Sequence, residues 1–168
     1  MARSSRRGLR YVLWAIVLLL VATVLGVRAF LQGSLPQLDG ERAASGLQSK
    51  VVVTRDALGV PTITGDGRGD VAYATGFLHA QDRFFQMDLL RRVAAGELAE
   101  LIGPAALSLD REHRIHQFRM RAEAELKRES PADRALLDRY VAGVNDGIAA
   151  LRARPFEYAL LGQQPKPW

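Results

Sequence analysis

The chain has 168 residues, of which 48% are hydrophobic and 24% charged, a balance typical of a globular protein rather than a disordered one. Its formal net charge is +5, but four of its 23 basic residues lie in the first ten positions with no acidic residue among them, so the rest is nearly neutral and no nucleic-acid partner is expected. The chain has no cysteine, which excludes disulfides, zinc-thiolate sites, iron–sulfur clusters and cysteine nucleophiles.

The N-terminus has the pattern of a membrane anchor. Residues 1–10 are basic, residues 11–27 carry no charge, and Arg28 follows. At about 1.5 Å per residue this run spans roughly 25 Å, slightly short of a hydrocarbon core of about 30 Å, so flanking arginines would have to snorkel. Residues 27–29 are a poor signal-peptidase site, which favours an uncleaved signal anchor over a cleaved signal. We predict a cytoplasmic basic segment at 1–10 and a transmembrane anchor at 11–31 in the inner membrane, with the remainder in the periplasm or otherwise outside the cytoplasm.

A linker and a hairpin are expected next. Residues 32–49 are polar and contain Gly and Ser, which is typical of a linker. Residues 50–55 have the β-branched content of a strand, 56–59 form a turn, and 60–64 can return as a second strand. Pro61 has no N–H for a ladder, so the second strand is expected at an edge.

A long helix follows the hairpin. The glycine-rich residues 65–69 lack the spacing of a phosphate-binding loop and are interpreted as a turn. Asp70 is a plausible N-cap, and residues 71–95 carry apolar side chains on nearly every face, which predicts a helix buried on several sides. Gly76 indicates either a break in this helix or a close approach of another backbone.

The second half of the chain is predicted to be helical. Residues 96–103 form a short helix between glycines, and residues 105–129 form one charged surface helix. Residues 130–133, Ser-Pro-Ala-Asp, are a strong helix start, and residues 152–155 supply the stop. Between them lies one apolar stripe at helical spacing, made of Leu137, Tyr140 or Val141, Val144, Ile148 and Leu151.

Four polar residues in the long helix are the first candidates for chemistry. Gln81 and Asp82 lie among aromatic and leucine side chains, where an unpaired polar group would cost on the order of 1 to 3 kcal/mol. We expect Arg83 and backbone groups of the adjoining loop or strand to pair with them. His79 has no carboxylate or serine at a useful spacing. A structural network is favoured over a catalytic acid–base pair.

Two other features are weaker candidates. His113 and His116 stand three residues apart and could offer two nitrogens to a metal, but no third ligand follows at a convincing spacing, which favours a solvated helix face. Gly33-Ser34 is the kind of bond at which self-processing hydrolases release an N-terminal serine, yet cleavage there would only detach the anchor. No catalytic, cofactor-binding or metal-binding residue is therefore predicted in this chain.

Two consecutive blocks resemble a known family: VTRDALGVPTI (residues 53–63) and GFLHAQDRFFQMDLLRRVAAGELAELIG (residues 76–103). They look like the opening of the α-chain of the penicillin acylase family, the N-terminal-nucleophile amide hydrolases that include cephalosporin and acyl-homoserine-lactone acylases. The resemblance runs from about Val51 to Trp168. It identifies residues 50–168 as the N-terminal part of such an α-chain.

The resemblance implies an α+β fold: a short β-hairpin and a mainly helical segment that begin an αββα N-terminal-nucleophile hydrolase. It implies a self-cleaving precursor in which a freed serine attacks a linear amide, with its own α-amine as the base. The family's nucleophile, substrate pocket and calcium ligands follow the point that corresponds to Trp168. We therefore expect an inactive fragment, without a cofactor of its own, whose partner is the rest of its precursor including the β-chain. The alternative is a complete single-pass helical interaction protein without catalysis.

Overall fold

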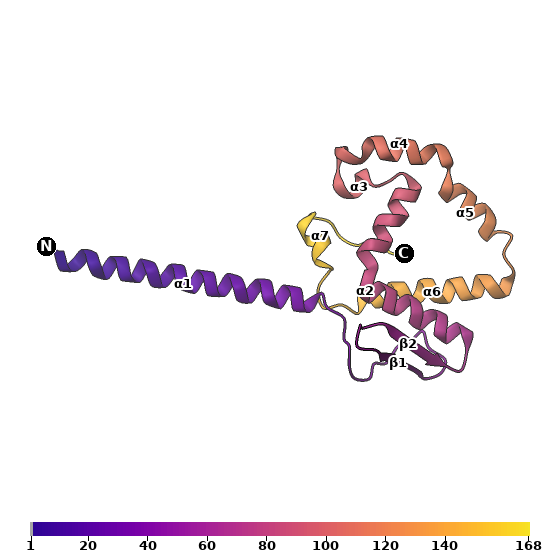
Figure 1. Ribbon diagram of the computed structural model, residues 1–168, viewed down its shortest axis with the longest axis horizontal. Coiled ribbons are helices and arrows are strands. Elements are labelled where there is room, and N and C mark those ends of the chain that lie inside the picture. Colours follow the sequence, from indigo (N-terminus) through magenta and orange to yellow (C-terminus); the bar gives the residue numbers. More distant parts are fainter. Residues whose placement is uncertain (1) are drawn as a thin grey trace.

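A computed structural model describes the backbone of residues 2–168 and the side chains of residues 8–168. Helix α1 (Ala2–Gly33) projects as a single rod from a domain that holds the other elements (Figure 1). The part from Gly8 to Gly33 is long and apolar enough to cross a membrane, and none of it is buried against the domain. A signal sequence and an anchor share these features.

The predicted hairpin is confirmed. Strands β1 (Val51–Arg55) and β2 (Pro61–Gly65) pair antiparallel, with Val53 opposite Ile63. The turn is built by Asp56, whose Oδ1 accepts two backbone N–H bonds of 2.9 Å each, and by Gly59, whose φ of +78° suits glycine. Both residues lie in the middle of the block VTRDALGVPTI, so this part of the block encodes a turn.

Helix α2 (Arg68–Ala95) is the longest helix of the domain, and it is kinked at Arg83, where φ is −147°. Its N-cap is Gly67, so the prediction that Asp70 caps it is wrong. Asp70 lies inside the first turn and accepts bonds from residues upstream instead of from helix N–H groups. The helix ends as predicted, because Gly96 takes the left-handed conformation with φ of +68°.

The core of the domain is the crossing of α2 with α6 (Pro131–Ala149), visible in Figure 1. A β-carbon added at Gly76 would lie 2.1 Å from the carbonyl oxygen of Tyr140, and one added at Gly143 would lie 1.9 Å from that of Tyr73. The two backbones therefore touch. Of the two interpretations of Gly76, the close approach is correct, and the break lies seven residues later at the kink.

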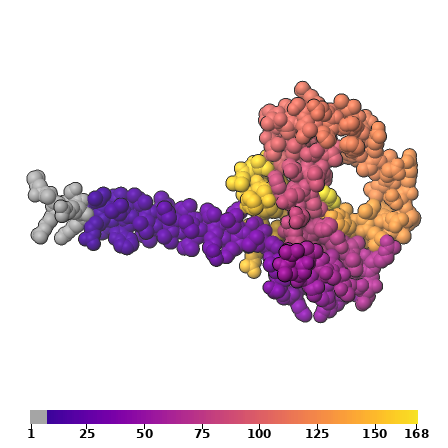
Figure 2. Space-filling view, viewed as in Figure 1, coloured from indigo at the N-terminus to yellow at the C-terminus, as the bar shows by residue number. Residues whose placement is uncertain are grey.

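The remaining helices are short. The single helix predicted over residues 105–129 is wrong: the chain breaks at Gln117, which has a φ of +52°. The elements around it are α3 (Ala99–Ile102), the 3-10 turn η1 (Pro104–Ala106), α4 (Leu107–His116), α5 (Phe118–Leu126) and α7 (Phe156–Leu160). Helix α5 has no buried residue, and Figure 2 shows an opening between it and the rest of the domain.

One hydrophobic cluster joins the elements. Val144 from the predicted apolar stripe is fully buried, whereas Leu137, seven residues earlier in the same stripe, is 46% exposed. The buried members of the cluster are Ala80, Phe84, Leu101, Val144 and Tyr158, with Phe85 and Trp168 packed against them. The core therefore lies around the middle of α2 and draws on α3, α6 and α7.

The segment predicted as a linker, residues 32–49, is partly ordered on the domain. Its first two residues extend α1, and the backbone N–H groups of Gln48 and Ser49 each donate a 2.9 Å bond to the Asp70 carboxylate. Gly46 lies against the ring of Tyr73, where a β-carbon would come within 2.1 Å of a ring atom. The end of this segment is thus a strap rather than a free tether.

Candidate functional site

The strongest concentration of charge inside the domain surrounds Asp88, on α2 beyond the kink. Asp88 is fully buried. Its Oδ1 accepts from the guanidinium of Arg91 at 2.6 Å, and its Oδ2 accepts from Arg92 Nε at 3.0 Å and from the Tyr158 hydroxyl at 2.6 Å. Helical spacing of three and four residues brings the two arginines to the carboxylate, and α7 supplies the tyrosine.

This carboxylate is poorly suited to take a proton. Burial alone would raise the pKa of Asp88, but the hydrogen bonds from Tyr158, Arg91 and Arg92 outweigh burial and hold that pKa below its ordinary value. Burial and the neighbouring Asp88 together raise the pKa of Tyr158. With both oxygens hydrogen-bonded and no exposed surface, Asp88 braces α2 against α7.

The same cluster ties the end of the chain to α2. Arg91 donates to the Pro167 carbonyl at 2.9 Å and lies 4.6 Å from the centre of the Trp168 ring. Glu100, on α3, accepts from Arg92 at 3.3 Å and from Lys166 at 3.0 Å. Residues 158–168 are thereby fastened to the long helix through charged groups as well as through the core.

The four polar residues of the LHAQDRFF block do not come together as one site. His79 Nδ1 lies 3.0 Å from the Tyr140 hydroxyl on α6. Asp82 forms a bidentate pair with Arg55 of β1, at 2.9 and 3.0 Å, so the prediction that Arg83 pairs with it is wrong. Asp82 and Arg83, the residue at the kink, are exposed, while Gln81 is buried. The pair between Arg55 and Asp82 thus joins the hairpin to α2.

A second network holds the strap. Besides its two backbone donors, Asp70 accepts from Arg139 at 2.7 Å. The bond from Gln48 is the largest cause that holds the pKa of Asp70 below its ordinary value, and the bonds from Ser49 and Arg139 add to it against burial. The Tyr73 hydroxyl donates to Asp146 at 2.5 Å, and burial followed by this bond raises the pKa of Tyr73 to about 12.

The two histidines considered as metal ligands both lie on α4. The rings of His113 and His116 lie 6.4 Å apart, and His116 stacks on Phe118 at 5.2 Å. His113 is half-buried, so the expected solvated face is only partly correct, and its Nδ1 has no partner among the described residues. In the part of the chain that the structure describes, no three His, Asp or Glu residues gather closely enough to hold a metal ion.

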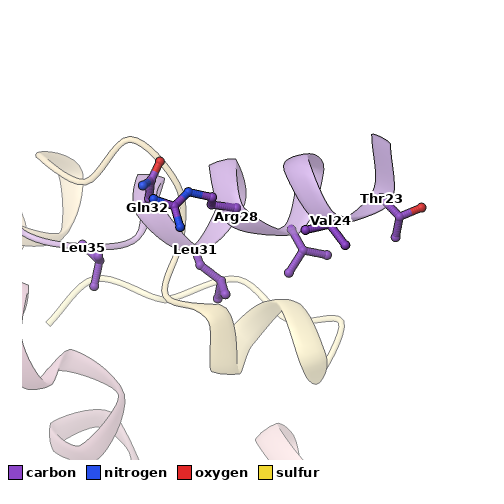
Figure 3. A pocket seen from close by; sticks show the side chains of 7 residues that line it. Thr23, Val24, Arg28, Leu31, Gln32 and Leu35 are labelled. Carbon is purple, nitrogen blue, oxygen red and sulfur yellow. The ribbon is translucent and has the colours of Figure 1, made fainter. Parts of the chain in front are cut away.

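One hollow borders the second network, and another lies along the end of α1. One, of about 210 Å³, is lined by Arg42, Tyr73, Phe77 and Asp146 where the strap meets the α2–α6 crossing. The other is an apolar groove of about 600 Å³ along the end of α1, shown in Figure 3. Its lining consists of Thr23, Val24, Val27, Arg28, Leu31, Gln32 and Leu35. This composition suits lipid or protein contact rather than bond-breaking chemistry.

Acid should unfold this domain over a defined range of pH. Asp70 and Asp88 both have folded-state pKa values below the ordinary 3.8. A depressed carboxylate contributes stability that is present above the unfolded pKa and is lost as the pH falls through the folded pKa. We expect the free energy of unfolding, measured by urea titration in detergent micelles, to hold above about pH 4 and to fall below it. Asp70→Asn should flatten this dependence, and a curve that stays level down to about pH 2 would contradict the assignment.

Comparison with known proteins agrees with this arrangement. A family model described as penicillin amidase matches residues 50–168. The penicillin acylase 2 proenzyme of Pseudomonas sp. (strain SE83) is 43% identical over 145 residues, which cover 84% of this chain and 18% of that protein. The acyl-homoserine lactone acylase QuiP of Pseudomonas aeruginosa is 38% identical over 136 residues, which cover 80% and 16% respectively. The chain thus spans less than a fifth of the length of these relatives.

A solved structure shows the same fold. The thermostable penicillin G acylase from Alcaligenes faecalis superposes with a TM-score of 0.64 and 31% sequence identity, over 71% of this chain and 65% of the other. The mainly helical domain with its short hairpin is therefore of the acylase type. The chain belongs to the penicillin amidase family.

Proposed function

We propose that this chain is the opening part of the α-chain of a self-processing acylase precursor that hydrolyses linear amide bonds, and that the nucleophile lies elsewhere in that precursor. The observation that carries the proposal is the family match over residues 50–168 combined with the state of the buried carboxylates. Asp70, Asp88 and Asp110 all accept structural hydrogen bonds. This chain contributes the rigid support for a site that other residues complete.

The proposed chemistry uses few groups. A serine at the start of the β-chain would attack the amide carbonyl while its own α-amine, which titrates near neutrality, accepts the hydroxyl proton. The relatives named above act on penicillins and acyl-homoserine lactones according to their names, and we propose an acyl substrate of one of these two kinds. We propose that any calcium ion of the precursor is held by residues that follow the point corresponding to Trp168, as the resemblance implies.

The remaining precursor, including the stacked sheets of an αββα fold, is the proposed partner. Apolar side chains on α4 and α5 support this: Ile115, Phe118 and Met120 are 79%, 47% and 56% exposed. Helix α5 borders the opening in Figure 2. Such a run of exposed apolar side chains is expected to be covered by another surface.

We further propose that residues 11–31 remain as an uncleaved anchor, with residues 1–10 in the cytoplasm and residues 50–168 in the periplasm. The support is the unburied apolar helix over Gly8–Gly33 and the basic residues that precede it. Residues 32–49 connect the two parts.

The 168-residue chain alone should hydrolyse no amide. We expect purified chain in detergent to release no product from a chromogenic acyl-anilide or from an acyl-homoserine lactone, and to bind a hydrophobic dye through its uncovered surfaces. An open reading frame that continues for several hundred codons past Trp168, with a Gly-Ser junction downstream, would support the precursor. Amide turnover by the chain alone would contradict the proposal, and a stop codon would favour a complete single-pass interaction protein.

A further inference from the structure

We propose that α7 and the loop before it form a surface that rests in the lipid headgroup region, beside the point where α1 leaves the bilayer. This inference deepens the proposed function and rests on its membrane anchor. It assigns to the domain a fixed orientation on the membrane, with α7 against anionic lipid.

Contacts place α7 beside the end of α1. The backbone N–H of Ala153 donates a 2.9 Å bond to the carbonyl oxygen of Gly33, the last residue of α1. A β-carbon at Gly33 would lie 3.1 Å from that of Ala153. Figure 1 shows α7 on the side of the domain from which α1 emerges, and Figure 3 shows Leu31 pointing toward it.

One face of helix α7 packs into the core of the domain. The opposite face is exposed. Tyr158 is fully buried. Phe156 and Leu160, four residues apart, lie on the opposite face and are 43% and 80% exposed, and Leu161 is 36% exposed. Side chains at this spacing form a continuous apolar strip, which is the kind of face that an interfacial helix buries in a membrane.

Along the axis of α1, this apolar strip lies close to the expected membrane surface. The uncharged run of α1 ends at Val27 and Arg28 follows it, so the interface lies near Arg28. Gly33 is five residues further on, which is about 7.5 Å along a helix. The apolar groove along α1 continues to Leu35, so apolar surface extends from the spanning segment to the level of α7.

The charges at this level favour anionic lipid. Arg28 lines the groove, and Arg152 and Arg154 lie in the loop that contacts Gly33, while Glu157 is the acidic residue of α7. Arg152 is exposed and Arg154 is half-buried. Basic side chains beside an apolar strip are attracted to anionic headgroups.

Single-cysteine labelling tests the proposal, because the sequence has no cysteine of its own. The full chain would be synthesised in a cell-free system with vesicles of phosphatidylcholine and phosphatidylglycerol and labelled with an environment-sensitive fluorophore. Three variants are compared: Leu160→Cys on α7, Ile16→Cys in α1 as the anchor control, and Leu137→Cys as the matched control. Leu137 is a 46% exposed leucine in the first half of α6, and the start of α6 lies on the side of the domain away from α1 (Figure 1).

We expect lipid spin labels placed near the headgroups to quench the Leu160 probe at a depth of about 5 to 10 Å, deep spin labels to quench the Ile16 probe, and neither to quench the Leu137 probe. A quenched Ile16 probe with an unquenched Leu160 probe would overturn this inference and leave the anchor intact, assigning the α7 face to another part of the polypeptide or to a second copy. Unquenched probes at both positions would overturn the inference and the anchor together. Equal quenching at Leu160 and Leu137 would also overturn it, since the contact would then be nonspecific.

Discussion

Replacement of Asp88 by alanine is expected to lower the free energy of unfolding by about 3 to 5 kcal/mol, because it leaves buried charge without a counter-charge. Arg92 is only 5% exposed, and it would keep only the weaker 3.3 Å contact with Glu100. The Tyr158 hydroxyl, on a fully buried side chain, would lose its acceptor. Urea titration of the full chain in detergent micelles measures this change when it is followed by near-ultraviolet circular dichroism, which reports the packing of the aromatic core.

An exposed ion pair supplies the control for Asp88. Glu125 pairs with Arg128 at 2.7 Å, with both side chains more than 60% exposed. Glu125→Ala is expected to change stability by less than about 1 kcal/mol, because water and salt screen such pairs. Equal effects at Asp88 and Glu125 would contradict a bracing role for the buried cluster.

The parts of the fold that local signals encode were predicted correctly. The start of α6 is an example, since Ser130 Oγ accepts the N–H of Asp133 at 3.1 Å and Pro131 occupies the first turn. The hairpin turn at Asp56 and Gly59 is another. In these cases the residues that decide the conformation lie within four positions of one another, so a window of sequence contains the whole cause.

The wrong predictions concern contacts between distant segments. Asp70 looks like an N-cap locally, but its partners lie 21 and 22 residues before it and 69 residues after it. The sequence predicts that Asp82 pairs with its neighbour Arg83. In the structure its partner is Arg55, 27 residues away. A carboxylate binds whichever donors the tertiary fold brings to it, and spacing along one helix does not reveal these donors.

The sequence analysis does not predict the Asp88 cluster, although the sequence contains part of its pattern. Asp88 with Arg91 and Arg92 is an acid followed by bases at three and four residues, the spacing of an ion pair on a helix. Such pairs are usually exposed and weak. The Asp88 pairs differ from such exposed pairs because Tyr158 of α7, 70 residues away, also donates a hydrogen bond to the Asp88 carboxylate.

Gly143→Ala is the second substitution with a large expected effect. We expect it to lower the free energy of unfolding, whereas the same change in an exposed helix raises it. In an exposed helix interior, glycine to alanine stabilises by about 1 kcal/mol. At Gly143 the added carbon would stand 1.9 Å from the carbonyl oxygen and 2.8 Å from the carbonyl carbon of Tyr73. These are backbone atoms of α2 that no rotamer change can move, so the two helices must separate.

Separation of the helices would spread along the whole crossing, because Gly76 and Gly147 make similar backbone contacts on either side of Gly143. Overpacking of this kind costs about 1 to 3 kcal/mol and more where the backbone must move, so we expect a loss of at least about 3 kcal/mol. Gly69→Ala is the matched control in α2, since its new carbon would meet only the Arg139 side chain at 3.6 Å. Urea titrations of the two variants should diverge in sign, and a Gly143→Ala chain as stable as the Gly69→Ala chain would show that α2 and α6 do not cross at backbone contact.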